Sequence, residues 1–334
     1  MDDPQFDVLA IGNAIVDVMA RADDDLLVRL GLAKGTMHLI DAERAEALYA
    51  AMGPAMEASG GSAGNTAAGL ASLGGRAAFI GKVADDTLGQ FYRHDMRAGG
   101  VAFDTAPLVD GAPTARSMIL ITPDGERTMN TYLGACHALG PADIDEAVVV
   151  AAAITYLEGY LWDPPEAKKA FRRAADIAHA AGRQVSLTLS DPFCVDRFRG
   201  EFLDLIKSGT VDIVFANDSE LRSLYETATL DTAVAALQSD CRLAVVTLGG
   251  DGAMVVSRDR VAKVKATPVE ALVDLTGAGD LFAAGFLLGV ARGMPLTDAA
   301  RLGTLAAAEV IGHMGPRPAA ALGDLARQAG FEIP

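Results

Sequence analysis

From about residue 150 onward, short apolar runs alternate with helical stretches, and this rhythm is the strongest constraint on the fold. Runs of strand length occupy residues 154–157, 185–189, 213–215 and 243–248. The helical stretch 165–181 begins with a proline and is followed by Gly182, an asymmetry that is common at helix ends. Such alternation predicts parallel β-strands joined by right-handed crossover connections.

The first half of the chain has one clear strand signal and then a weaker pattern. Residues 6–11 form an apolar run that ends at Gly12-Asn13, which predicts a buried strand whose following loop faces a ligand crevice. Residues 36–40 and 117–122 alternate like short strands, and we assign them to a small β appendage. With 334 residues and 51% apolar content, we expect a single large α/β domain spanning 1–334.

Late in the chain, residues 281–290 and 302–311 predict buried helices whose glycines and alanines let neighbouring backbones approach closely.

The charge of the chain restricts its partners. Lys and Arg total 28 against 44 for Asp and Glu, a formal charge of −16, which argues against binding to nucleic acid or to an anionic membrane surface. A phosphate compound would therefore have to be held locally, by backbone amides, helix N-termini and a bound cation.

The cysteines and the N-terminus indicate a cytoplasmic protein. Cys136, Cys194 and Cys241 are far apart and form no CxxC pair, which argues against a disulfide framework or a zinc site and favours a reducing compartment. The first residues lack the basic and apolar regions of a signal peptide, and no apolar run approaches the roughly 18 residues of a membrane helix.

The segment Asp274-Leu275-Thr276-Gly277-Ala278-Gly279-Asp280, directly before an apolar helix, carries the strongest chemical signal. Gly277 and Gly279 flank the small Ala278, so successive N–H groups can converge on one anion at a helix N-terminus. Phosphoryl transfer needs such donors and a base for the acceptor hydroxyl, and Asp280 could be that base. The alternative is an ordinary loop-to-helix turn. The sequence contains no GxxxxGK[ST] loop, and no GxGxxG follows the first strand.

Two motifs together resemble a known family. Gly60-Gly61-Ser62-Ala63-Gly64-Asn65, continuing to Gly81-Lys82-Val83, and residues 274–280 resemble both signatures of the ribokinase (phosphofructokinase-B) family of sugar and nucleoside kinases. Matches at Gly12-Asn13 with Asp17, at 217–220 and at 247–249 extend the resemblance over nearly the whole chain. It implies a three-layer α/β/α sheet, a small β lid built from segments within about 14–60 and 100–132, and an ATP-dependent kinase that uses Mg²⁺.

The resemblance also implies a role for individual residues. Asp280 would be the catalytic base, and the anion hole would comprise Gly277, Ala278 and Gly279. Asp17 would hold two vicinal hydroxyls of the substrate, and the remaining substrate residues would be Asn13, Gly60, Gly61, Asn65 and Tyr160. The nucleotide site would comprise Asn217, Glu220, Thr247, Gly249, Gly252 and Gly315, with Glu220 organising the water shell of Mg²⁺. Asp274 and the loop around Gly315 could hold a monovalent cation such as K⁺.

Several of these residues have a plainer interpretation. Asp17 could be a solvated turn acid, and Asn65 could be only a helix cap. Asn217 with Glu220 is the pattern of a capping box, and residues 249–252 read equally well as a hairpin turn.

The substrate expectation rests on residues 12–17 and on Ser186-Leu187-Thr188-Leu189-Ser190-Asp191-Pro192-Phe193, which are more similar to adenosine kinases than to ribokinase. Candidates for clamping a nucleoside base are Met37, Leu39, Phe103 and Tyr160, each of which could instead belong to the core. We expect phosphorylation of the primary 5′-hydroxyl of a purine nucleoside, adenosine giving AMP. The alternatives are a furanose sugar kinase of the ribokinase or fructokinase type and a nucleoside-binding protein without turnover. Whether the protein is a monomer or a homodimer stays open.

Overall fold

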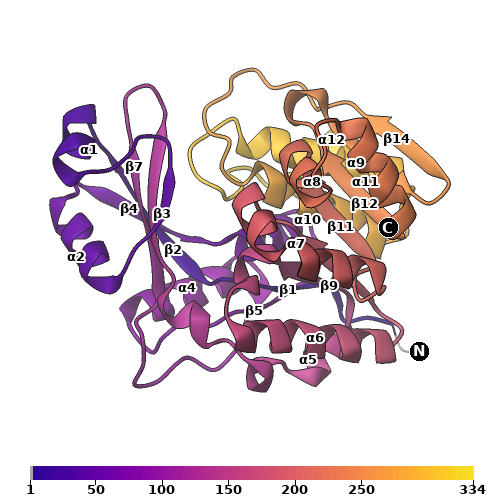
Figure 1. The fold of residues 1–334 in the computed structure, drawn as a ribbon, viewed down its shortest axis with the longest axis horizontal. Helices are drawn as coiled ribbons and strands as arrows, with labels where there is room; N and C mark the ends of the chain where they lie inside the picture. Colours follow the sequence, from indigo (N-terminus) through magenta and orange to yellow (C-terminus); the bar gives the residue numbers. More distant parts are fainter. Residues whose placement is uncertain (1–2) are drawn as a thin grey trace.

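The large sheet confirms the α/β prediction. In the computed structural model, which describes residues 3–334, nine strands lie in the order β14-β13-β12-β11-β10-β9-β1-β5-β6 (Figure 1). Their bounds are β1 (Phe6–Ile11), β5 (Ala77–Ile80), β6 (Val101–Ala102), β9 (Ala152–Glu158), β10 (Gln184–Thr188), β11 (Ile213–Asn217), β12 (Leu243–Thr247), β13 (Ala253–Ser257) and β14 (Arg260–Val264). The strands from β6 to β12 pair in parallel, whereas β13 and β14 pair antiparallel at one edge.

Helices cover both faces of this sheet, which makes three layers. One face carries α3 (Ser62–Ser72), α4 (Thr87–Ala98), α10 (Ala278–Ala291), α11 (Leu296–Val310) and α12 (Leu322–Gln328). The other carries α5 (Glu146–Ala151), α6 (Pro165–Ala180), α7 (Pro192–Lys207), α8 (Asp218–Leu224) and α9 (Leu230–Asp240). Each face has its own core because alternate strand residues point to opposite sides: Val8 and Ala10 join one cluster, Leu9 and Ile11 the other.

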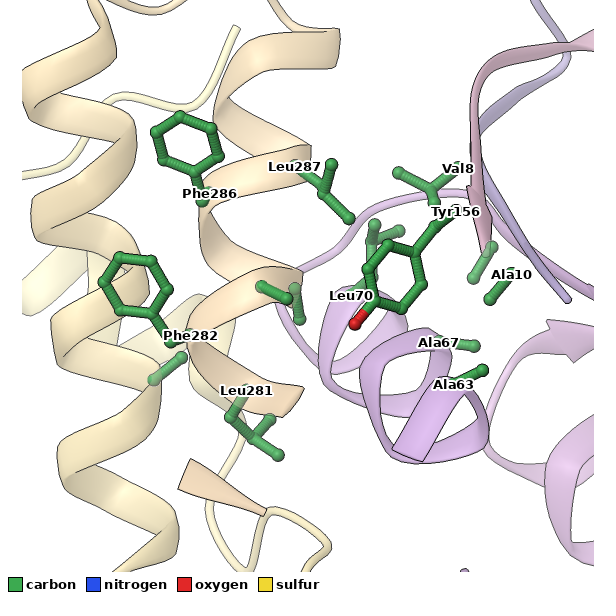
Figure 2. Packing of buried hydrophobic residues seen from close by; sticks show 14 of the residues in the cluster. Val8, Ala10, Ala63, Ala67, Leu70, Tyr156, Leu281, Phe282, Phe286 and Leu287 are labelled. Atoms are coloured by element: carbon green, nitrogen blue, oxygen red, sulfur yellow. The ribbon is translucent and has the colours of Figure 1, made fainter. Parts of the chain in front are cut away.

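The first core brings α3 and α10 together over the middle of the sheet. Figure 2 shows Ala67 and Leu70 of α3 and Leu287 of α10 around Tyr156 of β9. Helices α10 and α11 meet through glycines, since a Cβ atom on Gly285 would lie 2.7 Å from a backbone nitrogen of α11. This close packing holds the first turn of α10 at a fixed place beside the sheet.

Five strands form a second sheet that projects from the main body beside α4 (Figure 1). Its order is β3-β8-β7-β2-β4, with β2 (Ile15–Arg21), β3 (Met37–Leu39), β4 (Ala55–Gly60), β7 (Ala115–Ile121) and β8 (Arg127–Tyr132). Two helices, α1 (Asp24–Leu30) and α2 (Ala42–Ala51), accompany it, and the sequence pattern gave no sign of them. Its own buried cluster is small, consisting of Met19, Ile119 and Ile121.

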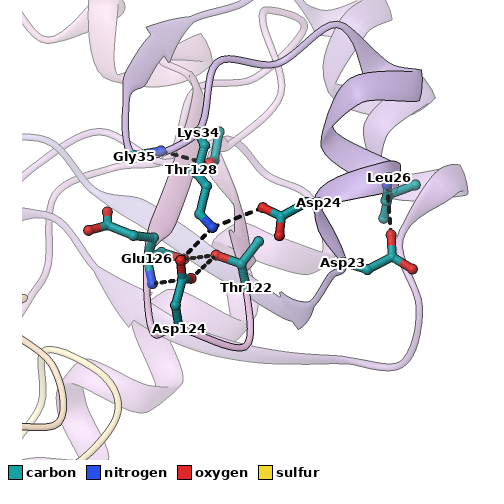
Figure 3. A network of polar contacts seen from close by, with 9 residues as sticks. All are labelled: Asp23, Asp24, Leu26, Lys34, Gly35, Thr122, Asp124, Glu126 and Thr128. Carbon is teal, nitrogen blue, oxygen red and sulfur yellow. Dashed lines mark hydrogen bonds and ion pairs between the residues drawn. The ribbon is translucent and has the colours of Figure 1, made fainter.

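The outer end of the second sheet is held by exposed polar contacts (Figure 3). Lys34 lies 2.9 Å from Asp24 and 2.5 Å from Asp124, so it joins the segment after α1 to the turn between β7 and β8. Thr122 donates to Asp124 within that turn. Exposed ion pairs stabilise weakly and are screened by salt, so this end of the sheet depends on few strong contacts.

Short 3₁₀ helices complete the chain: η1 (Gly134–Ala138), η2 (Pro141–Asp143), η3 (Gly159–Trp162) and η4 (Gly249–Asp251).

The three cysteines are buried and unpaired. Within residues 3–334, no helix has the length and apolarity needed to cross a bilayer.

Candidate active site

A cavity of about 470 Å³ lies between the carboxyl ends of the parallel strands and the second sheet. It gathers most of the predicted residues, namely Asn13, Asp17, Gly61, Asn65, Tyr160, Asn217, Glu220, Thr247, Gly277, Ala278, Gly279 and Asp280. The predicted residues outside its lining are Gly60, Gly249, Gly252, Asp274 and Gly315. Segments more than 260 residues apart therefore meet in one cavity, as expected at the carboxyl edge of a parallel sheet.

The glycine-rich turn opens α10. Gly277 is the N-cap residue with φ 82°, and a Cβ atom there would lie 2.8 Å from the carbonyl oxygen of Pro316, so the position requires glycine. The N–H of Ala278 donates to the carbonyl of Leu275 at 3.3 Å. Among the described residues, the N–H groups of Gly277 and Gly279 have no acceptor, which leaves them available to an anion in the cavity.

Asp280 lies in the first turn of α10 and accepts two side-chain hydrogen bonds. Its oxygens receive one from Ser62 Oγ at 2.6 Å and one from Asn65 Nδ2 at 2.8 Å. Burial raises the pKa of Asp280, while these two bonds and the charge of Arg317 lower it. Asn65 lies inside α3, whose N-cap is Gly61, so the interpretation of Asn65 as a helix cap is wrong.

Asp17 lies within β2 and is only 8% exposed, so the interpretation as a solvated turn acid is wrong. The backbone of Gly60 packs against the carboxylate of Asp17, since a Cβ atom on Gly60 would lie 2.3 Å from Asp17 Oδ2. The structure gives this carboxylate no hydrogen-bond donor among residues 3–334, and it faces the cavity. Burial raises the pKa of Asp17 to about 7, against the lowering effect of Arg317 and Arg127.

Glu158 is a cavity residue that the sequence interpretation missed. It ends β9, and its carboxylate accepts from Asn13 Nδ2 at 2.7 Å and from the N–H of Ala63 at 2.8 Å. Burial raises the pKa of Glu158 to about 7. These bonds fix the amide of Asn13. Among the described residues, neither Oδ1 of Asn13 nor Oδ1 of Asn65, both buried, has a hydrogen-bond donor. Asn13 and Asn65 both line the cavity, and acceptors of this kind suit a ligand that brings hydroxyl donors.

At the far end of the cavity, Asn217 and Glu220 form a capping box at the start of α8, which confirms that interpretation. The N–H of Glu220 donates to Asn217 Oδ1 at 2.8 Å, and Glu220 Oε2 accepts from the N–H of Asn217 at 3.0 Å. Burial raises the pKa of Glu220 to about 7. Gly249 and Gly252 lie in the hairpin turn between β12 and β13, both with positive φ.

Asp274 has partners inside the protein. Its carboxylate forms an ion pair with Arg127 of β8 and accepts from the N–H of Gly315 at 2.9 Å and of Thr276 at 3.0 Å. The predicted K⁺ site stays a prediction, and the carboxylate oxygens that it would use are engaged in these contacts.

The side of the cavity formed by the second sheet combines polar side chains, Asp17, Ser117 and Thr131, with an apolar wall. Met37 and Leu39 belong to this apolar wall, as expected of base-clamping residues, together with Met129. Tyr160 of η3 and Phe193 of α7 line the cavity from the main body. The prediction for Phe103 is wrong. It is 1% exposed, and its ring packs edge-on against Phe79 of β5 and Tyr92 of α4, with ring centroids 5.2 and 5.8 Å apart. Phe103 therefore belongs to the core between β5 and α4.

Comparison with known proteins places the chain in a family. The model of the pfkB family carbohydrate kinases matches residues 32–321. The crystal structure of adenosine kinase from Sinorhizobium meliloti is 60% identical, with a TM-score of 0.93 and coverage of 98% of this chain and 100% of that one. A probable sugar kinase from Rhizobium etli is 56% identical, with the same TM-score and coverage of 98% and 99%. An ATP-dependent ribose-1-phosphate kinase from Halopiger xanaduensis is 33% identical over 69% of this chain and 73% of its own length. The chain belongs to the pfkB family of carbohydrate kinases, which transfer a phosphoryl group to an alcohol.

Proposed function

We propose that this protein phosphorylates the 5′-hydroxyl of a purine nucleoside, adenosine first, at the expense of ATP. One observation carries the proposal: a single cavity holds the glycine turn with Asp280 and a buried carboxylate, Asp17, that has no hydrogen-bond donor among residues 3–334. A carboxylate can accept hydrogen bonds from both hydroxyls of a ribose. The free acceptors Asn13 Oδ1 and Asn65 Oδ1 support a ligand rich in hydroxyl groups.

For the transfer step, we assign the proton of the acceptor hydroxyl to Asp280. Ser62 and Asn65 orient its carboxylate, and the N–H groups of Gly277 and Gly279 would stabilise the charge that develops on the transferring phosphoryl group. We assign the exclusion of water during this step to closure of the second sheet over the cavity.

ATP would bind toward Asn217, Glu220 and Thr247, which line the far end of the cavity. Mg²⁺ would supply charge neutralisation on the nucleotide phosphates. In the described part of the chain, no cluster of three or more His, Cys, Asp or Glu residues could hold a metal ion. The buried carboxylate of Glu220, in this part of the cavity, fits an ion that keeps its waters and binds mainly through phosphate oxygens.

The wall composition favours a nucleoside over a sugar phosphate. Met37, Leu39, Tyr160 and Phe193 offer apolar and aromatic surface to a planar base. Among the described lining residues, Arg197 is the one basic side chain, and it is paired with Asp163 at 2.6 Å, so a second phosphate on the acceptor would find little compensation. The 60% identical relative is an adenosine kinase, which agrees with this choice.

The alternative is a furanose sugar kinase, which the 56% identical probable sugar kinase favours. The two functions share the hold on vicinal hydroxyls and the transfer chemistry. They differ in whether the apolar wall has an occupant.

An acceptor panel distinguishes these functions. We expect ADP release with Mg-ATP to have its highest kcat/KM with adenosine, among adenosine, guanosine, inosine, ribose, fructose and ribose 1-phosphate. The matched control is 5′-deoxyadenosine, which lacks the reacting hydroxyl: it should raise the melting temperature of the protein and release no ADP above background. A preference for fructose or ribose would replace the nucleoside assignment with the alternative, and stabilisation by adenosine without ADP release would indicate a binding protein.

The pH dependence of kcat/KM should show an acid limb near pH 7. Burial raises the pKa of Asp17 to about 7 and that of Asp280 in the same direction, and both carboxylates act in the ionised form, so activity is lost as pH falls through this range. Steady-state kinetics with adenosine from pH 5 to 9 check this. A profile that stays flat down to pH 5 would contradict the assigned roles.

The cytoplasmic location and the choice between monomer and homodimer stay predictions from the sequence.

A further inference from the structure

The loop after α11 carries one arginine, Arg317, that contacts the segment next to the candidate active site. Arg317 is partly buried, and its guanidinium donates from Nε to the carbonyl of Ser59 at 2.7 Å and from Nη1 to the carbonyl of Gly64 at 2.9 Å. A third contact joins Nη2 to the sulfur of Met96 at 3.3 Å. In the described chain, no carboxylate lies within ion-pair distance of Arg317, which is unusual for an inward-facing arginine.

The two carbonyls bound by Arg317 mark the ends of one short segment, residues 59–64. This segment is the junction where β4 of the second sheet passes into α3 of the main body. It contains Gly60, whose backbone lies against the carboxylate of Asp17, and Ser62, which donates to Asp280. The same junction therefore contacts both Asp17, which is assigned to the substrate hydroxyls, and Asp280, which is assigned to the proton of the acceptor hydroxyl.

The loop that carries Arg317 also contacts the glycine turn. The backbone of Pro316 lies within 2.9 Å of the place where a Cβ atom of Gly277 would be, and the N–H of Gly315 donates to Asp274. Residues 315–317 thus contact the phosphoryl end of the site on one side and the acceptor junction on the other.

We propose that Arg317 is a positioning residue for phosphoryl transfer, which holds the junction 59–64 at a fixed place relative to the glycine turn. The proposal rests on the proposed function for the roles of Asp17 and Asp280. A guanidinium suits the task because its rigid fork can donate to two carbonyls at once, which a lysine cannot do in the same geometry.

The charge of Arg317 has a second consequence. Burial raises the pKa of both Asp17 and Asp280, and Arg317 lowers both. The titratable and charged groups that interact with these three residues include Tyr92, Asp95, Arg127, Tyr156, Glu158 and Tyr160. Removal of the positive charge should therefore move the acid limb of the rate profile to higher pH, because both carboxylates would then hold their protons more strongly.

The test compares Arg317→Gln and Arg317→Lys with the parent enzyme, using whichever acceptor of the panel the parent phosphorylates best. For Arg317→Gln we expect kcat/KM to fall roughly 10- to 100-fold, with kcat reduced and the acid limb at higher pH. For Arg317→Lys we expect an acid limb close to that of the parent, because the charge is kept, and a kcat/KM that is still reduced. The control is Arg327→Gln, which removes an exposed arginine paired only with Asp324 within α12 and should change neither quantity.

Melting temperatures separate positioning from folding. If Arg317→Gln does not fold, the lysine variant decides: parental kcat/KM in Arg317→Lys would overturn the proposal. A folded Arg317→Gln variant with parental kcat/KM and acid limb would overturn it too, as would failure of both variants to fold, which would make Arg317 a stability residue. The parent enzyme's own preference in the panel reports separately on the proposed nucleoside function.

Discussion

Asp280→Asn should retain binding of adenosine and ATP while kcat falls by about 100-fold or more, because a general base contributes roughly 10²- to 10⁴-fold to a proton transfer. The amide has nearly the shape of the carboxylate but cannot take a proton from the hydroxyl. Ser62 and Asn65 both donate to this carboxylate, so the variant also tests whether orientation alone is enough. Single-turnover ADP formation and calorimetric binding of adenosine separate the two effects.

Stability should move in the opposite direction to activity in this variant. The pKa of Asp280 is higher in the folded protein than in the unfolded chain, so the unfolded chain releases this proton at lower pH. As pH rises above the pKa in the unfolded chain, ionisation of Asp280 therefore lowers the stability of the folded protein. A neutral amide removes that cost, and the melting temperature of Asp280→Asn at pH 8 should not be below that of the parent. The matched control is Asp231→Asn, an acid in the first turn of α9 outside the cavity lining, which should keep full activity. Parental kcat in Asp280→Asn would require another base.

Asp17→Asn should reduce kcat/KM for adenosine by about 100-fold, since hydrogen bonds to a charged group contribute about 1.5 to 3 kcal/mol each. An asparagine side chain can accept through only one of its terminal atoms, so one of the two ribose hydroxyls loses its partner. The loss should be concentrated in KM, because these hydroxyls do not react.

The substrate provides the control for Asp17. The parent should discriminate strongly between adenosine and 2′,3′-dideoxyadenosine, and the Asp17→Asn variant should discriminate far less, since the interaction is already gone. Steady-state kinetics of both enzymes with both nucleosides give a thermodynamic cycle that measures the coupling between Asp17 and the ribose hydroxyls. Equal discrimination by parent and variant would show that Asp17 does not contact these hydroxyls.

The sequence predicted the parts of the molecule whose signal is local. The strand at 6–11 is apolar apart from Asp7 because it is buried on both faces. The turn before α10 is recognisable because Gly277 must adopt a positive φ against Pro316. The second sheet was seen only in part. Strand β2 is buried along nearly its whole length, so the alternation that marks a half-exposed strand is absent.

The residues missed in the site have partners that no local pattern encodes. Glu158 bonds an amide 145 residues earlier, and Arg317 bonds backbone carbonyls of Ser59 and Gly64, which any residue supplies. The prediction for Phe103 was wrong for the converse reason: the sequence cannot distinguish a large apolar side chain that lines a cavity from one that fills a core.

The product of the parent enzyme with adenosine and Mg-ATP tests the central assignment most directly. Phosphorus and proton NMR of the purified product should show phosphorus coupled to the protons on C5′ of the ribose, with ADP formed in equal amount. A phosphoryl group on a secondary hydroxyl, or ADP accompanied only by inorganic phosphate, would contradict an acceptor whose 5′-hydroxyl lies at Asp280 while Asp17 holds the ring hydroxyls.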